Sequence, residues 1–165
     1  MKKTNIFIAC DTTNIKKIRE IIKVTESSKL NFGYKFGLEF LNTRNGRKFI
    51  SNIKNKVTFG DYKLADIPNT CASASIAVKD LKFNYITIHI SSGLKAIKAA
   101  KKVSGKTKLI GVTILTSLDN KSLKEIGFDK NVKKIVLNQA KLAAKARLDA
   151  IVCSPQEIKI VKKVF

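Results

Sequence analysis

Short apolar runs alternate along this chain with amphipathic segments. The first run, residues 5–10, is almost continuously apolar and stops at Asp11. The segment after it, residues 14–25, carries isoleucines that fall on one face of a helix. Such runs are typical of buried strands, and such segments are typical of helices that cover a sheet. The pattern predicts strands at residues 5–10, 31–36, 57–59, 85–89, 108–114 and 150–153.

The segments between and after these runs predict helices. Each predicted strand is followed by one, and this alternation implies a parallel sheet with right-handed crossovers. The length of 165 residues suits a single domain spanning residues 1–165. The helices are expected at residues 14–25, 38–54, 72–81, 94–102, 121–146 and 155–163.

Two α/β architectures fit this alternation: an open doubly wound sheet and a TIM (β/α)8 barrel. Six strand–helix units in 165 residues suit the open sheet. However, no glycine-rich phosphate loop follows the first strand, so nothing marks a nucleotide-binding switch point. Polar residues instead follow several different strands, which is how a barrel builds its site.

Charged and polar side chains stand where the predicted strands end. Because the carboxyl ends of parallel strands meet at one edge of a sheet, we expect these side chains to converge. Asp61 and Lys63 are two positions apart and therefore lie on the same face of a strand. Asp66 falls in the next loop, and Pro68 favours the start of a helix. The strand-end residues are Asp11, Lys35, Asp61, Lys63, His89 and Thr116.

These positions lack the usual donors of a metal site. No cysteine or histidine cluster joins them, so metal-ligand chemistry lacks its usual donors. His89 by itself is expected to be a structural histidine at a strand end. The three cysteines are far apart and form no C-x-x-C motif, which predicts free thiols in a reducing cytoplasm. No stretch approaches the length of a membrane span.

The segment from Asp61 to Thr70, Asp-Tyr-Lys-Leu-Ala-Asp-Ile-Pro-Asn-Thr, resembles the signature of the orotidine 5'-monophosphate decarboxylase family. The resemblance continues in order over essentially the whole chain. It is carried by Ala9-Cys10-Asp11, by Tyr34-Lys35-Phe36-Gly37-Leu38-Glu39, by His89, by Val112-Thr113-Ile114-Leu115-Thr116-Ser117 and by Leu148-Asp149-Ala150-Ile151-Val152-Cys153-Ser154.

The resemblance implies a TIM barrel of the bacterial type, with only about the first six βα units in this chain. The family's later Pro-Gly-Ile-Arg and Gly-Arg segments, which bind phosphate, do not follow Ser154. A C-terminally truncated form is therefore expected. Two positions also depart from the family pattern: Ala65 stands where histidine is common, and Arg147 stands where glycine is usual. If the latter position needs a positive φ, the arginine costs about 1 kcal/mol.

The implied activity is the decarboxylation of orotidine 5'-monophosphate to UMP in pyrimidine biosynthesis, without metal or cofactor. By resemblance, Lys63 protonates C6 of the pyrimidine after CO2 leaves, in a charged row formed with Lys35, Asp61 and Asp66. The implied assembly is a cytoplasmic homodimer in which Asp66 and Thr70 reach the partner's site. The implied substrate contacts are Asp11, Lys35, Asp61, Lys63, Asp66, Ile67, Thr70 and Thr116.

Two other functions remain open from the residues. A magnesium-dependent sugar-phosphate decarboxylase or aldolase of the same superfamily would share the D-x-K-x-x-D frame, although a carboxylate would be expected where Lys35 stands. The net charge of +21 could instead mark an inactive, basic nucleic-acid-binding remnant. The charge comes from 33 Lys and Arg residues, of which only four are Arg, and they are spread over the chain. We therefore expect neither a nucleic-acid nor a membrane partner.

Overall fold

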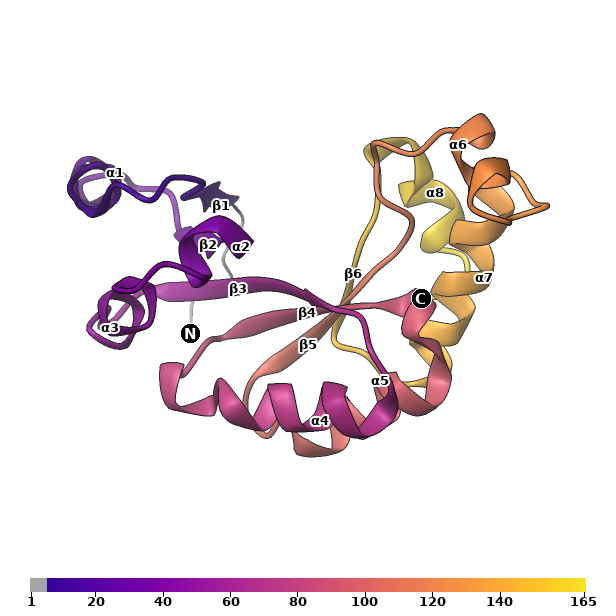
Figure 1. The fold of residues 1–165 in the computed structure, drawn as a ribbon. Coiled ribbons are helices and arrows are strands. Elements are labelled where there is room, and N and C mark those ends of the chain that lie inside the picture. Colours follow the sequence, from indigo (N-terminus) through magenta and orange to yellow (C-terminus); the bar gives the residue numbers. More distant parts are fainter. Residues whose placement is uncertain (1–5) are drawn as a thin grey trace.

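A computed structural model describes residues 6–165 and contains a single six-stranded parallel sheet (Figure 1). Each strand pairs with the next one in the sequence, in the order β1-β2-β3-β4-β5-β6. This sequential order is that of a β/α barrel and not of a doubly wound sheet. The strands are β1 (Ile6–Ala9), β2 (Phe32–Phe36), β3 (Val57–Leu64), β4 (Tyr85–His89), β5 (Lys108–Val112) and β6 (Ala150–Val152).

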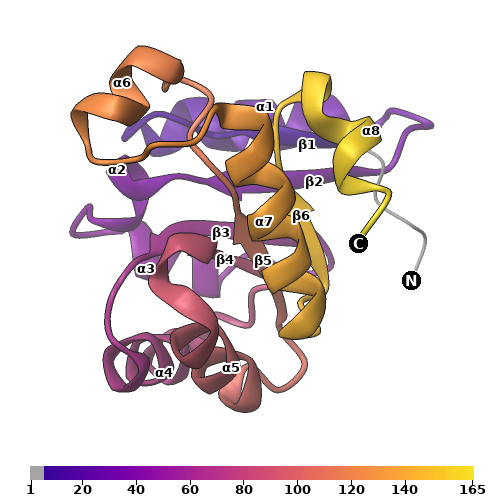
Figure 2. The same ribbon diagram turned by 90° about the vertical axis from the view of Figure 1, so that its right-hand side faces the viewer.

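The sheet curves into a half-barrel, and the helices cover its convex side (Figures 1 and 2). Within residues 6–165, β1 and β6 each have one paired neighbour, so the barrel is open between them. The first residue of the predicted first strand, residue 5, lies outside the described part. The helices are α1 (Ile15–Glu26), α2 (Leu38–Leu41), α3 (Gly46–Ser51), α4 (Pro68–Ala77), α5 (Gly93–Val103), α6 (Asn120–Glu125), α7 (Val132–Lys145) and α8 (Ile158–Val161), with 3-10 turns η1 (Lys79–Leu81), η2 (Ile90–Ser92) and η3 (Pro155–Glu157).

Two helices predicted as continuous are each divided in two. The predicted helix 38–54 becomes α2 and α3, because Asn42 and Thr43 bond back to carbonyls of α2 through their side chains. The predicted helix 121–146 becomes α6 and α7, separated by a turn that contains Gly127 at φ 88°. The third strand was expected at residues 57–59 but extends to Leu64, so it carries Asp61 and Lys63 within it.

The main core lies between the convex face of the sheet and the helices. Tyr34 and Phe36 of β2 and Ile86 and Ile88 of β4 are buried there. The Tyr34 hydroxyl also bonds with Thr25 of α1 at 2.7 Å, which ties the first helix to the sheet. None of the helices in the described part of the chain is long and apolar enough to cross a membrane.

Three aromatic rings form the floor of the concave face. Phe7 of β1 meets Phe59 of β3 at 5.2 Å and Tyr85 of β4 at 5.4 Å, measured between ring centroids. Phe7 can reach across β2 because its register partner there is Gly33, which has no side chain. The floor therefore joins β1, β3 and β4 below the carboxyl ends of the strands.

Arg147 follows α7 in the left-handed conformation, with φ 55°. The Arg147 N–H donates to the Ala144 carbonyl at 2.9 Å, and the Leu148 N–H donates to the Ala143 carbonyl at 3.1 Å. These bonds close the C-terminus of the helix in a way that favours glycine. The condition stated from the sequence, a positive φ at this position, is therefore met.

We predict that Arg147→Gly raises the free energy of unfolding by about 1 kcal/mol, because glycine adopts a positive φ without strain. Urea unfolding of the variant and the wild type measures the difference. Arg147→Ala is the matched control, since it removes the same side chain but keeps the strained Cβ. Equal stabilisation by both variants would show that the side chain, and not the backbone, is responsible.

Candidate active site

Four charged side chains form a row where the first three strands end. The Nζ of Lys63 lies 2.7 Å from Oδ2 of Asp61, and the Nζ of Lys35 lies 3.3 Å from the same oxygen. Lys35 also lies 3.5 Å from Oδ1 of Asp11, two residues beyond β1. The row therefore alternates in sign, Asp11–Lys35–Asp61–Lys63, and the structure brings these four predicted residues together.

The row depends on an irregular stretch of β3. The pairing of β3 with β4 shifts in register between Gly60 and Leu64, and Lys63 adopts φ 48°. A positive φ in a residue with a Cβ costs about 1–2 kcal/mol. The sequence predicted Asp61 and Lys63 on one face of a regular strand, and it is this strained bulge that carries Lys63 towards the carboxylate.

Asp61 is the most buried member of the row, at 8% exposure. Burial by itself raises the pKa of the Asp61 carboxyl, but the hydrogen bond and charge of Lys63, with the charge of Lys35, outweigh it and hold the pKa below its usual range. Burial also lowers the pKa of nearby His89, as does the Lys63 ammonium, while Asp61 opposes them. The imidazole is therefore neutral at pH 7.

Thr87, on β4, is a member of the site that the sequence did not predict. Its hydroxyl donates to Oδ1 of Asp61 at 3.0 Å, and it accepts the Lys63 backbone N–H at 2.8 Å. Thr87 is fully buried. The only sequence signal was its place two residues before His89 on the same strand, which puts both side chains on one face.

The segment Asp66–Thr70 lies away from the row of its own chain. Asp66 is exposed, and its Oδ1 accepts the backbone N–H of Ile67 at 2.7 Å. Among residues 6–165 it forms no ion pair with a lysine. Ile67 is 66% exposed, and Thr70 is exposed in the first turn of α4. The prediction that Pro68 begins a helix is confirmed.

Thr116 is exposed in the loop after β5. It lines a cavity of about 490 Å³ with Lys133 of α7 and Ser154, which follows β6. The cavity thus opens at the carboxyl ends of β5 and β6, on the same edge of the sheet as the charged row.

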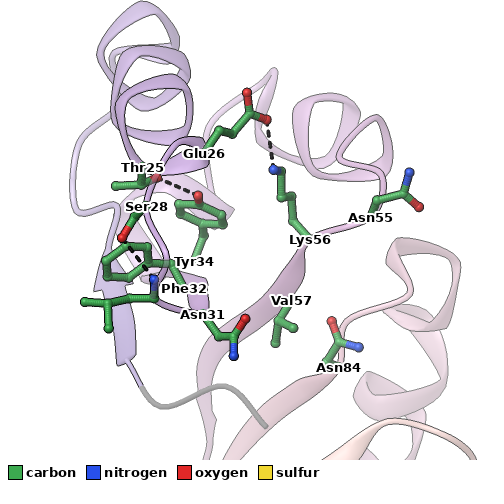
Figure 3. Close-up of a pocket in the computed structure, with 11 residues that line it drawn as sticks. Thr25, Glu26, Ser28, Asn31, Phe32, Tyr34, Asn55, Lys56, Val57 and Asn84 are labelled. Carbon is green, nitrogen blue, oxygen red and sulfur yellow. Dashed lines mark hydrogen bonds and ion pairs between the residues drawn. The ribbon is translucent and has the colours of Figure 1, made fainter. Parts of the chain in front are cut away.

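Another cavity, of about 560 Å³, lies at the opposite, amino-terminal edge of β2 and β3 (Figure 3). Its polar side chains are largely engaged with one another: Glu26 pairs with Lys56 at 2.8 Å, and Thr25 bonds Tyr34. We therefore place the candidate site at the charged row and not in this cavity. In the described part of the chain, no group of three or more His, Cys, Asp or Glu side chains could hold a metal ion.

Residues 4–165 match the sequence model of the family described as orotidine 5'-phosphate decarboxylase / HUMPS. The chain is 41% identical over 157 residues to the orotidine 5'-phosphate decarboxylase of a Wolbachia from Brugia malayi, covering 92% of this chain and 68% of the relative. It is 37% identical over 166 residues to the enzyme of the same name from Sphingopyxis alaskensis, covering 97% and 71%.

Solved structures give the same result. Orotidine 5'-phosphate decarboxylase from Lactobacillus acidophilus superimposes with a TM-score of 0.84 at 27% identity, covering 98% of this chain and 76% of that one. Orotidine 5'-monophosphate decarboxylase from Methanocaldococcus jannaschii, complexed with the inhibitor BMP, gives 0.74 at 25% identity, covering 96% and 72%.

The charged row makes a prediction about stability. Asp61→Asn should lower the free energy of unfolding at pH 7 by about 1–3 kcal/mol, because two ammonium groups lose their shared carboxylate. Since the folded pKa of Asp61 is depressed, its contribution is present above the unfolded pKa of about 4 and is lost as pH falls through the lower folded value. Urea unfolding of both proteins from pH 7 to pH 3 should therefore show the difference shrinking at the acid end. A difference in the free energy of unfolding that does not change with pH would contradict this prediction.

Proposed function

The chain belongs to the orotidine 5'-phosphate decarboxylase / HUMPS family, and on this basis we propose that it decarboxylates orotidine 5'-monophosphate to UMP, a step of pyrimidine biosynthesis. The observation that carries the proposal is the alternating row Asp11–Lys35–Asp61–Lys63. A row of fixed, alternating charges suits a reaction in which charge moves from a substrate carboxylate to a ring carbon. It provides an ammonium where the new charge develops.

The chemistry assigned to this row needs no electron sink in the substrate. The bond between C6 and the carboxylate breaks, CO2 leaves, and the electron pair stays on C6. Lys63 then transfers a proton from its Nζ to C6, which gives UMP. Asp61 lies against the substrate carboxylate, and two carboxylates about 4 Å apart repel by about 4 kcal/mol at an effective dielectric constant of 20. Departure of CO2 relieves that repulsion.

Asp61 has a second role in this scheme, which is to keep the lysines protonated. A carboxylate within hydrogen-bonding distance favours the charged form of an amine. By the family resemblance, Lys35 and Asp11 are assigned to the ribose hydroxyls, and they stand beside the reactive pair, on β2 and after β1. Thr116 is assigned to the base. Binding energy from the distant phosphate would support the positioning of the reacting carbon.

The same scheme proposes a homodimer. Asp66, Ile67 and Thr70 are exposed and do not contact the row of their own chain, and Lys63 pairs with one carboxylate only in the described residues. We assign Asp66, Ile67 and Thr70 to the site of the partner subunit, where Asp66 extends the alternation beyond Lys63. The cytoplasm is the proposed location, in keeping with three free cysteines.

The second candidate function is a magnesium-dependent reaction on a sugar phosphate, within the same superfamily. It shares the frame of Asp61, Lys63 and Asp66. However, Lys35 stands in the row where a metal would require an anionic oxygen ligand, and it is already paired with Asp11 and Asp61. Turnover that requires added Mg²⁺ and is abolished by a chelator would favour this function over the first.

We predict that Lys63→Ala lowers kcat for orotidine 5'-monophosphate by at least about a thousandfold, because the proton donor to C6 is lost. The loss of absorbance on conversion to UMP measures the rate, and circular dichroism checks the fold. Lys95→Ala, an exposed lysine of α5, is the matched control and should retain wild-type turnover. Wild-type turnover by the Lys63 variant would rule out its role as proton donor.

Shared sites predict complementation between two inactive variants. Lys63→Ala and Asp66→Asn should each be nearly inactive alone. After unfolding and refolding together in equal amounts, about a quarter of wild-type activity should return, because half of the dimers are mixed and each mixed dimer holds one intact site. No recovery in a mixture that contains mixed dimers, identified with differently tagged chains, would place Asp66 in the site of its own subunit.

A further inference from the structure

The hydroxyl of Thr87 joins the two residues that the proposed reaction depends on most. It donates its hydrogen to Oδ1 of Asp61 at 3.0 Å and accepts the backbone N–H of Lys63 at 2.8 Å. A hydroxyl has one hydrogen to donate and two lone pairs to accept with, so both bonds can form at once. Thr87 is 0% exposed, and water does not compete for either bond.

The bond to Lys63 replaces a missing ladder bond. The register of β3 against β4 shifts between Gly60 and Leu64, and Lys63 stands in this stretch with φ 48°. A buried backbone N–H left without an acceptor would cost about 1–3 kcal/mol. The side chain of Thr87 supplies that acceptor, and it thereby supports the strained backbone from which the Lys63 side chain extends.

Because of the bond from Thr87, the two oxygens of the Asp61 carboxylate have different partners. Oδ2 receives Lys35 and Lys63, at 3.3 Å and 2.7 Å, whereas Oδ1 receives Thr87. Rotation of the carboxylate would exchange the oxygens and break this arrangement. The hydroxyl therefore fixes the plane of the carboxylate with one oxygen turned towards both lysines.

We propose that Thr87 is a positioning residue for the decarboxylation, holding the Asp61 carboxylate and the Lys63 backbone in one fixed geometry. This inference rests on the proposed function, because it assigns Thr87 a role through Asp61 and Lys63. Thr87 acts through these residues and has no direct part in the proton transfer. A serine can make the same two bonds, whereas an isosteric valine can make neither.

The variants Thr87→Val and Thr87→Ser test the proposal in the 165-residue protein. Valine should lower kcat by about ten- to a hundredfold with a smaller change in KM, because the reacting groups lose their alignment. Serine should restore kcat to within about threefold of the wild type. Equal kcat for all three proteins would overturn the proposal.

Thr113 offers a matched control on the neighbouring strand end. It is also a buried threonine, at 2% exposure, and its hydroxyl donates to the Val152 carbonyl at 2.9 Å, away from the charged row. Thr113→Val removes the same atoms and should lower the unfolding midpoint to a similar degree. It should leave kcat and the pH profile unchanged. An equal loss of kcat in the Thr113 variant would show that the Thr87 variant loses activity through general destabilisation.

Titration of the Asp61 carboxyl by ¹³C NMR gives a readout that does not depend on turnover. The groups that face this carboxyl are Lys63 on its own strand, Lys35 on β2 and His89 on β4, with Asp11 behind Lys35. All of them remain in the variants. Loss of the Thr87 bond should therefore raise the pKa of Asp61 in the valine variant and move the acid limb of kcat to higher pH. Serine should leave both at the wild-type values.

The two readouts separate the two proposals. If the wild-type protein does not turn over orotidine 5'-monophosphate, the proposed function fails, and the titration still decides whether Thr87 controls Asp61. If the wild type is active but valine changes neither kcat nor the Asp61 titration, the role of Thr87 is wrong and the proposed function stands.

Discussion

A carboxylate that is almost removed from water is the constraint on which the rest of this structure depends. Asp61 is 8% exposed, and an ionised carboxylate at such a position is costly unless charged partners and hydrogen bonds surround it. Lys63 and Lys35 supply the charges, and Thr87 supplies the remaining hydrogen bond. Because these partners come from β2, β3 and β4, the carboxylate is stable only when the three strands are in their native register.

The strained backbone of β3 at Lys63 is stabilised by contacts on both sides. The bulge in β3 places Lys63 at φ 48°, and the shifted register leaves the Lys63 backbone N–H without a ladder partner on β4. Thr87 compensates for this at one end of the strand. At the other end, the contact of Phe7 with Phe59, made across Gly33, fixes β1 relative to β3. The irregular stretch is therefore held between two sets of contacts, which lets a local strain persist.

The positions of the strands and the four residues of the row could be predicted from the sequence, because both follow from local patterns. Apolar runs mark the strands, and residues at the carboxyl ends of parallel strands must converge. The division of the predicted helix 121–146 at Gly127, the length of β3 and the role of Thr87 could not be predicted. Each depends on a backbone conformation or on a register between strands, and neither leaves a periodic signal. The family resemblance placed Asp66 in the row of the partner subunit, and in its own chain the Asp66 side chain is exposed.

The outward position of Asp66 follows from the way α4 begins. The Asp66 side chain bonds the N–H of Ile67, and Pro68 then starts the helix with its φ already fixed. This turn presents an acid, an exposed isoleucine and Thr70 to the outside. An exposed apolar side chain beside an acid is poorly suited to solvent and well suited to a complementary surface with a positive charge. Lys63, the last member of the row, carries such a charge and is one-third exposed, with a side-chain exposure of 32%. The homodimer proposed above, with its shared site, accounts for both features in one arrangement.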